Sequence, residues 1–200
     1  MEEQKRMHEY VNISRENNSD EKRWSKARDI FNRTNQLQLG SYYSHAIHND
    51  IKHFSFTLSR YKFVAKLLMY KDSVDLLELG CQEGLGALMF EQNINLGRYV
   101  GVDLDQEAIE WNKEHLSNDF EFDCANFLDY PGLMDRGGEF DAVVSLDVIE
   151  HIDSRMENKF CEVISSSLKE DGIAIIGTPN IMMSPYVSEE TQIAHINLYD

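Results

Sequence analysis

Residues 147–151 (DVIEH) bring two carboxylates and an imidazole close together in the chain. A histidine titrates near neutral pH, so His151 could take a proton from a bound substrate that Asp147 orients. With His195 as a further donor, the same side chains could instead hold a divalent metal ion, because carboxylate oxygens and imidazole nitrogens are suitable ligands. A third interpretation is structural, with Glu150 and His151 capping the next helix and bracing the sheet. Spacing alone leaves all three interpretations open.

A glycine-rich turn at residues 80–86 (GCQEGLG) follows an apolar run at residues 74–79. Glycines let the backbone approach a ligand closely, and the N-terminus of the helix that follows favours a negative group. The dinucleotide pattern G-x-G-x-x-G is not matched, because Gln82 occupies the middle glycine position. The turn therefore predicts a ligand site and argues against a nicotinamide-dependent oxidoreductase.

Asp103 lies 23 residues after Gly80, at the end of another apolar run. A carboxylate at this place can accept hydrogen bonds from both hydroxyls of a ribose. Asp105 stands directly before an amphipathic stretch and fits a helix N-cap better than Asp103 does. We therefore expect Asp103 to bind the ribose of a nucleoside ligand.

Five short apolar runs alternate with amphipathic stretches between residues 74 and 177. This alternation predicts an α/β fold, a doubly wound and mainly parallel sheet with helices on both faces. The expected strands are residues 74–79, 99–103, 120–124, 142–146 and 173–177. The expected helices between them are residues 85–92, 106–116, a short one near 127–134, and 155–169, which Asp171-Gly172 ends.

The chain before the first expected strand differs from the rest in composition and hydrophobic pattern. Its first ~35 residues are polar, and they predict a helix with a weak apolar face (Trp24, Ile30, Phe31) or partial disorder. Residues 40–43 interrupt this pattern, and a stronger helix is expected over residues 53–70. Its apolar face consists of Phe54, Leu58, Tyr61, Ala65 and Leu68. We divide the chain into an N-terminal extension, residues 1–52, and a ligand-binding domain, residues 53–200.

Charge and composition limit the partners and the cellular compartment that we expect for this protein. Residues 71–200 hold 7 basic and 27 acidic residues, a net charge of −20, which repels phosphate backbones and argues against nucleic-acid partners. No apolar run approaches the ~20 residues that span a bilayer, and the polar N-terminus lacks the apolar core of a secretory signal. Three cysteines without C-x-x-C spacing predict neither a disulfide framework nor a zinc cage. We expect a cytoplasmic protein without membrane contact.

Three segments resemble the class I S-adenosylmethionine-dependent methyltransferases. Residues 78–86 (ELGCQEGLG) resemble their first motif, E-x-G-x-G-x-G, except at Gln82. Residues 120–127 (FEFDCANF) resemble the segment that holds the adenine, where Asn126 could accept from the amino group and Phe127 could flank the ring or pack in the core. Residues 140–152 (FDAVVSLDVIEHI) are similar to the fourth motif of the small-molecule branch, which includes ubiquinone-pathway O-methyltransferases.

The resemblance implies a Rossmann-like fold, S-adenosyl-L-methionine as cofactor, and a small-molecule methyl acceptor. The cofactor-binding residues it implies are Glu78, Gly80, Cys81, Gln82, Gly86, Asp103, Leu104, Asn126, Phe127 and Leu146. Asp147, His151 and His195 are the catalytic candidates. Methyl transfer would be in line, and a hydroxyl acceptor would need a base, whereas an amine would need only its lone pair.

Further segments bear on the acceptor. Residues 40–44, 59–64 and 188–198 resemble parts of methyltransferases associated with bacterial polysaccharide synthesis, which points to a sugar or nucleotide-sugar acceptor and to Tyr42 or Tyr43 beside it. The D-x-x-E-H pattern also resembles the E-x-x-E-H of small-RNA 3′-end methyltransferases, which use a metal. The alternatives are thus a metal-assisted RNA methyltransferase and a catalytically silent cofactor-binding module.

The family's sheet normally ends in an antiparallel hairpin of two further strands. Only about 20 residues follow the fifth expected strand, so the hairpin is expected to be missing and residues 173–177 to form an apolar edge. We expect either that the natural chain extends beyond Asp200 or that a partner, such as a second copy in a homodimer, covers this edge.

Overall fold

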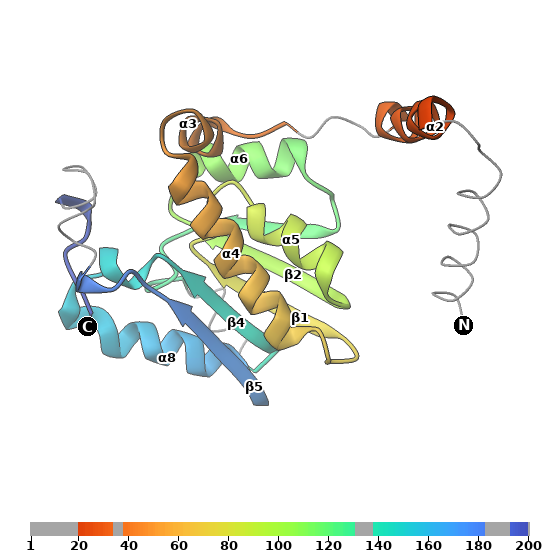
Figure 1. Ribbon diagram of the computed structural model, residues 1–200. Coiled ribbons are helices and arrows are strands. Elements are labelled where there is room, and N and C mark those ends of the chain that lie inside the picture. The colour runs from red at the N-terminus through yellow and green to blue at the C-terminus, as the bar shows by residue number, and fades with distance from the viewer. Residues whose placement is uncertain (1–19, 34–37, 131–137, 183–192, 200) are drawn as a thin grey trace. The chain divides into compact units, whose positions relative to one another are not determined.

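The computed structural model describes residues 20–33, 38–130, 138–182 and 193–199 (Figure 1). The chain divides into two compact units, residues 1–38 and 39–200. The first contains helix α2 (Asp20–Arg33), on which Trp24 and Phe31 meet edge to face with ring centroids 6.5 Å apart. Both side chains are more than half exposed, as is that of Ile30, so the predicted apolar face is not buried within this unit.

The second unit alternates helices and strands as expected. Its helices are α3 (Ser41–Asn49), α4 (Ile51–Leu68), α5 (Leu85–Asn93), α6 (Gln106–His115) and α8 (Glu157–Ser167), with short 3-10 turns η1 (Ile149–His151) and η2 (Ser154–Met156). Its strands are β1 (Val74–Leu79), β2 (Leu96–Asp103), β3 (Phe120–Cys124), β4 (Phe140–Leu146) and β5 (Leu168–Gly177). Residues 39–52, grouped with the extension in the sequence analysis, thus form α3 and the start of α4 within this unit.

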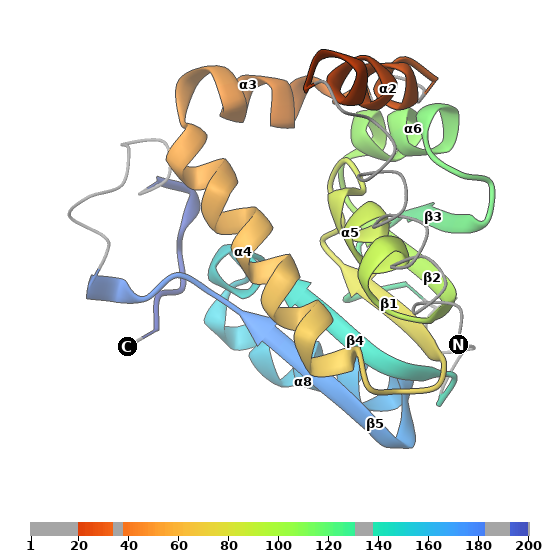
Figure 2. The same cartoon turned by 45° about the vertical axis from the view of Figure 1, so that its right-hand side comes forward.

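The strands form a five-stranded parallel sheet in the order β3-β2-β1-β4-β5. Side chains alternate between its faces: Leu76 of β1 lies in one core and Leu77 in the other. Helices α4, α5 and α6 cover the first face through residues such as Val64 and Phe90, and α8 covers the second through Phe160 (Figure 2). The expected doubly wound sheet with helices on both faces is confirmed.

Several boundaries differ from the sequence prediction. Strands β2, β4 and β5 begin earlier than expected, because Leu96 and Arg98 pair with β1, and Phe140 of β4 pairs with Leu168 of β5. The helix predicted over residues 155–169 stops at Ser167, and Asp171-Gly172 lie inside β5, where the register shifts beside β4. Residues 40–43 start α3 rather than interrupt a helix. In the short helix predicted near 127–134, residues 127–130 form a turn, and the rest lies outside the described residues.

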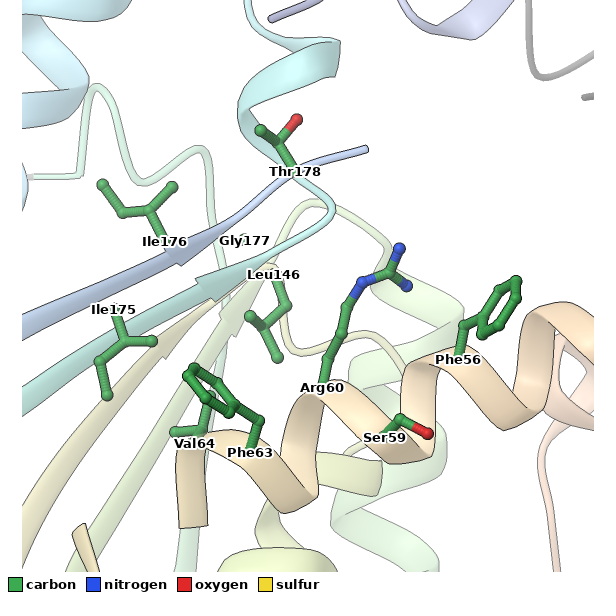
Figure 3. Close-up of a pocket in the computed structure, with 10 residues that line it drawn as sticks. All are labelled: Phe56, Ser59, Arg60, Phe63, Val64, Leu146, Ile175, Ile176, Gly177 and Thr178. Atoms are coloured by element: carbon green, nitrogen blue, oxygen red, sulfur yellow. The ribbon is translucent and has the colours of Figure 1, made fainter. Parts of the chain in front are cut away.

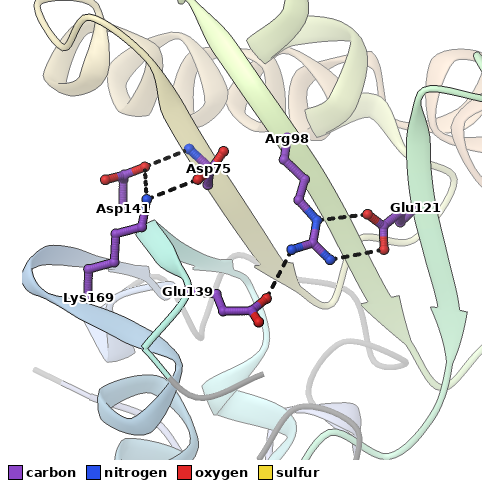
Figure 4. Close-up of polar contacts among 6 residues, drawn as sticks. All are labelled: Asp75, Arg98, Glu121, Glu139, Asp141 and Lys169. Atoms are coloured by element: carbon purple, nitrogen blue, oxygen red, sulfur yellow. Dashed lines mark hydrogen bonds and ion pairs between the residues drawn. The ribbon is translucent and has the colours of Figure 1, made fainter. Parts of the chain in front are cut away.

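Charged side chains are paired at the amino ends of the strands (Figure 4). Arg98 on β2 donates from Nε and Nη2 to Glu121 at 2.7 and 3.2 Å and from Nη1 to Glu139 at 3.0 Å. Lys169 on β5 bridges Asp75 and Asp141, with 2.9 Å to each carboxylate. These contacts join neighbouring strands of the sheet.

Strand β5 pairs only with β4 among the described residues, which leaves its other edge without a strand. Ile173 and Ile176 on β5 are 38% and 44% exposed, so this edge is apolar as expected. In the part of the chain that the structure describes, no helix combines the length and hydropathy needed to cross a bilayer.

Candidate functional site

The predicted site residues gather at the carboxyl end of the sheet. The turn that starts at Gly80 follows β1, Asp103 ends β2, Asn126 follows β3, and Asp147 follows β4. In a parallel sheet these ends lie along one edge, where ligands of doubly wound folds bind. The sequence places each residue after its strand, and the parallel order brings them to a common edge.

The turn between β1 and α5 has a left-handed backbone. Gly80 and Gly84 have φ of 83° and 65°, and Gln82 between them has φ of 45°. A Cβ on Gly80 would lie 2.2 Å from Cγ2 of Val148, so only glycine fits there. Gln82 is held despite its strained backbone, because its carbonyl accepts from Asn112 Nδ2 at 2.6 Å.

Asp103 ties this turn to β2. Its Oδ2 accepts from the backbone N–H of Gln82 at 2.8 Å, and its Oδ1 accepts from that of Asp105 at 2.9 Å. Asp105 in turn caps α6, accepting from the N–H groups of Glu107 and Ala108. The cap predicted for Asp105 is confirmed. Asp103 instead bonds to the turn at Gln82 and to the backbone of Asp105.

Two predicted cofactor residues, Glu78 and Cys81, have fully buried side chains. Glu78 is fully buried, and its carboxylate accepts from the hydroxyls of Tyr61 at 2.7 Å and Tyr99 at 2.5 Å. Burial raises the pKa of Glu78 to about 7, against the lowering effect of the two phenols. A Cβ on Gly86 would lie 2.0 Å from Oε2 of Glu78, so this glycine gives the carboxylate its space. Cys81 is also fully buried, which raises the pKa of its thiol.

The residues assigned to the adenine side differ in exposure. Leu104 is 65% exposed beside Asp103. Asn126 is exposed, and its Oδ1 accepts from the backbone N–H of Leu128 at 3.1 Å. Phe127 is only 6% exposed and packs against Phe160 with ring centroids 6.0 Å apart, which matches the core interpretation of this residue.

Asp147 is strained and ion-paired. Its φ is 55°, and its Oδ2 lies 2.8 Å from Nη1 of Arg60 on α4. Burial raises the pKa of the Asp147 carboxyl, and Arg60 opposes that rise. Sequence reasoning missed Arg60, because nothing in the charge pattern of α4 shows which basic residue faces the strand ends.

Glu150, His151 and His195 come together although His195 is far away in sequence. Each offers one ligand atom, and these atoms lie within 4.8 Å of one another. Glu150 is fully buried; Thr178 Oγ1 donates to its Oε2 at 3.1 Å, while its Oε1 has no hydrogen-bond partner in the described chain. The two imidazole rings meet edge to face at 4.9 Å. The structure thus places His195 beside His151, as the metal interpretation requires.

The tautomer of His151 follows from its partner. Nδ1 lies 3.0 Å from the backbone carbonyl of Ala194, which can only accept, so Nδ1 carries the proton and Nε2 the lone pair. Burial, then the neighbouring His151, lowers the pKa of His195, which keeps that ring neutral at pH 7. The capping interpretation fails in part: Asp153 caps the turn that follows, and no side chain caps α8. Bracing is retained through the contact between Glu150 and Thr178.

A pocket of about 380 Å³ opens between α4 and the ends of β4 and β5 (Figure 3). Its walls are apolar apart from Ser59, Arg60 and Thr178. Figure 3 shows Arg60 reaching from α4 toward the strand ends, where it pairs with Asp147. Leu146, predicted beside the cofactor, lines this pocket.

Comparisons with known proteins agree with this architecture. A family model described as a methyltransferase domain matches residues 77–176. The chain is 30% identical over 120 residues to a mitochondrial ubiquinone biosynthesis O-methyltransferase of Arabidopsis thaliana, covering 58% of this chain and 36% of the relative. It is 26% identical over 136 residues to a small RNA 2′-O-methyltransferase of Rattus norvegicus, covering 63% and 34%. The chain therefore spans about a third of the length of these curated relatives.

Solved structures share the fold. The PH0226 protein of Pyrococcus horikoshii superposes with a TM-score of 0.59 at 21% identity, covering 78% of this chain and 70% of that one. A SAM-dependent methyltransferase of Archaeoglobus fulgidus superposes with a TM-score of 0.55 at 18% identity, covering 77% and 71%. These likenesses identify a Rossmann-like sheet and leave the chemistry to the site itself.

Proposed function

Since the chain belongs to the methyltransferase domain family, we propose that it transfers a methyl group from S-adenosylmethionine to a hydroxyl or amine of a small molecule. The observation that carries the proposal is the position of Asp103. Its carboxylate joins the glycine-rich turn to the end of β2, two strand ends away from Asp147, so a nucleoside site and an acid–base cluster share one edge of the sheet.

The residues at this edge fit the cofactor. Asp103 presents two carboxylate oxygens, which suit the two hydroxyls of a ribose. Leu104 is exposed beside it and offers an apolar surface for an adenine. Gly80 and Gly84 allow the left-handed backbone of the turn and its close packing against Val148 and Leu116. The sulfonium of the bound cofactor supplies a methyl group that is electrophilic without further activation.

The chain's own part in the reaction is orientation and proton removal. The Ala194 carbonyl fixes the His151 ring, which leaves the Nε2 lone pair to accept a proton from the methyl acceptor. Asp147 and His195 lie beside it as the other catalytic candidates, and Asp147 is itself held by Arg60. A hydroxyl acceptor would give its proton to Nε2, whereas an amine acceptor would react through its lone pair.

The pocket beside Arg60 is our candidate for the acceptor site. Its apolar walls, with Phe56 and Phe63 on α4, support an acceptor that has an apolar face as well as a reactive hydroxyl or amine. Saccharides and aromatic compounds both meet this description. The sugar or nucleotide-sugar acceptor expected from the sequence thus stays one of two acceptor classes, and a panel of both would separate them.

A divalent cation at Glu150, His151 and His195 is a second candidate role for the cluster. The observation that favours it is the buried Oε1 of Glu150, which has no hydrogen-bond partner in the described chain although it lies in a set of ligand atoms. A histidine ligand commonly donates its other ring N–H to a carbonyl, as His151 does. Titration with Mn²⁺ or Mg²⁺ should show binding in the wild type and not in Glu150→Gln if this role holds.

Calorimetric titration with S-adenosylmethionine, S-adenosylhomocysteine and NAD tests the proposal. The two sulfur nucleosides should bind and NAD should not. Asp103→Ala should weaken their binding about 100-fold, because two hydrogen bonds to a charged acceptor are lost. Asp119→Ala, at the amino end of β3, is the matched control and should bind as the wild type does. Binding of NAD alone would overturn the proposal. Cofactor binding without transfer to any acceptor would identify a silent module.

A further inference from the structure

Glu83 lies in the glycine-rich turn, and its side chain contacts the start of α3. Its Oε1 accepts from the backbone N–H of Tyr42 at 2.7 Å, and its Oε2 accepts from that of Tyr43 at 3.0 Å. The hydroxyl of Ser41 donates to the same carboxylate at 3.5 Å. Glu83 is only 5% exposed, so its charge is enclosed between the turn and the start of α3.

Helix α3 needs this carboxylate. The first N–H groups of any helix lack partners within it, and α3 begins after Gly40, which has no side chain to cap them. Glu83 acts as the missing cap from a position about 40 residues later in the chain, where its charge also suits the positive end of the helix. A Cβ on Gly40 would lie 2.2 Å from Cδ of Glu83, so a residue larger than glycine cannot occupy this position without moving the contact.

The docked helix carries Tyr42 with it. The Tyr42 side chain is 44% exposed, and its ring meets that of Tyr43 edge to face with centroids 5.2 Å apart. Partial burial and the charges of Asp147 and Glu83 raise the pKa of its hydroxyl, and Arg60 lowers it. Tyr43 is buried in the core and holds the opposite side of the helix in place.

We propose that Glu83 is a positioning residue that couples the cofactor turn to α3, so that binding at the turn orders the first turn of this helix, which carries Tyr42. The inference rests on the proposed function for the identity of the ligand. In this assignment the backbone of the turn meets the cofactor, and the Glu83 side chain holds the start of α3 against the turn. Coupling of this kind is reciprocal, so a ligand at the turn must also strengthen the docking of α3.

Hydrogen exchange and calorimetry test the coupling with S-adenosylhomocysteine as the probe. In the wild type, the probe should slow amide exchange in residues 41–49. Glu83→Ala should speed exchange there, with residues 157–167 of α8 unchanged, and should raise the Kd of the probe at least about fivefold, the lower range of such couplings. Glu83→Gln retains one acceptor and should restore part of both effects. Glu91→Ala, an exposed glutamate on α5, is the control and should change neither.

A second variant approaches the contact from the other side. Gly40→Ala leaves the turn intact and places a methyl group against the Glu83 carboxylate, so it should reproduce both effects even if Glu83→Ala fails to fold. A probe Kd within twofold of wild type in Gly40→Ala, or exchange in residues 41–49 that the probe leaves unchanged, would overturn the coupling. Failure of the wild type to bind the probe at all would instead overturn the proposed function.

Discussion

The two ends of the sheet carry the same kinds of side chain and use them differently. At the amino end, Arg98 and Lys169 each pair with two carboxylates (Figure 4). At the carboxyl end, only Asp147 pairs with a basic residue among the three acidic site residues Asp103, Asp147 and Glu150 in the described chain. Asp103 accepts from backbone N–H groups and Glu150 from a hydroxyl.

Within the described residues, strain and missing hydrogen bonds lie at the carboxyl end. The non-glycine residues with positive φ in this part of the chain are Gln82 and Asp147, and both follow a strand. Five buried side-chain atoms of the described residues lack a hydrogen-bond partner, and all belong to this end or its immediate neighbours. They are Gln82 Oε1, Asn112 Oδ1, Asp147 Oδ1, Glu150 Oε1 and Arg60 Nη1, of which the last is still ion-paired with Asp147. A folded chain retains such costs where the geometry serves a ligand.

This difference between the two ends separates the contacts that stabilise the sheet from the side chains that are available for chemistry. The amino-end pairs are partly exposed, with side-chain exposures of 34% for Arg98 and 45% for Glu121, so solvent screens them. They connect strands of the sheet. The carboxyl end instead holds buried polar atoms that lack a hydrogen-bond partner in the described chain.

The largest expected effect comes from His151 at the carboxyl end. His151→Ala should lower kcat by about 10²–10⁴-fold for a hydroxyl acceptor, because the base is lost, while the Kd of S-adenosylhomocysteine stays within twofold. His115→Ala is the control, since that ring stacks on Trp111 on the surface of α6. Steady-state kinetics with the acceptor found in the panel would measure it. A kcat within tenfold of wild type would contradict the base role.

Glu78 should give a smaller effect, seen in the pH dependence of stability. Its pKa rises from 4.5 to about 7 on folding, so the folded chain holds this proton more tightly than the unfolded chain does. The free energy of unfolding should therefore be highest below pH about 4.5, fall by about 3 kcal/mol as pH rises to about 7, and level off above it.

Denaturant unfolding between pH 5 and 8 would measure this change. Glu78→Gln removes the titrating group and should flatten most of the decline, whereas Glu91→Gln should leave it unchanged. Asp147 and Glu150, whose pKa values burial also raises, should retain a weaker decline in the variant. An equal decline in wild type and Glu78→Gln would show that this carboxyl is not its source.

The smallest effect is expected at the amino end. Arg98→Ala should lower the free energy of unfolding by about 1 kcal/mol or less, and added salt should shrink the difference, because the pairs are screened. The affinity for S-adenosylhomocysteine should not change. A Kd that rises more than threefold would break the comparison, since the two ends would then be energetically linked.

Local patterns made much of this site predictable. The glycines of the turn, Asp103 at the end of β2 and Asp105 at the start of α6 were placed correctly, because each depends on its own strand or helix. The boundary between α8 and β5 at residues 167–168 was predicted wrongly, because the register shift in β5 depends on its pairing with β4. Nothing local indicates that Phe127 points into the core or that Glu78 is fully buried.

By itself, the sequence determined the order of strands and helices, the glycine-rich turn, and the acidic and imidazole residues that follow the strands. These features rest on periodicity and on residues adjacent in the chain, and local physics acts over such distances. Only the tertiary structure decided which side chains meet: Arg60 with Asp147, His151 with His195, and Glu83 with the start of α3. Each of these pairs is separated by at least 40 residues, so the packing of helices and loops on the sheet, and not spacing along the chain, sets their contact.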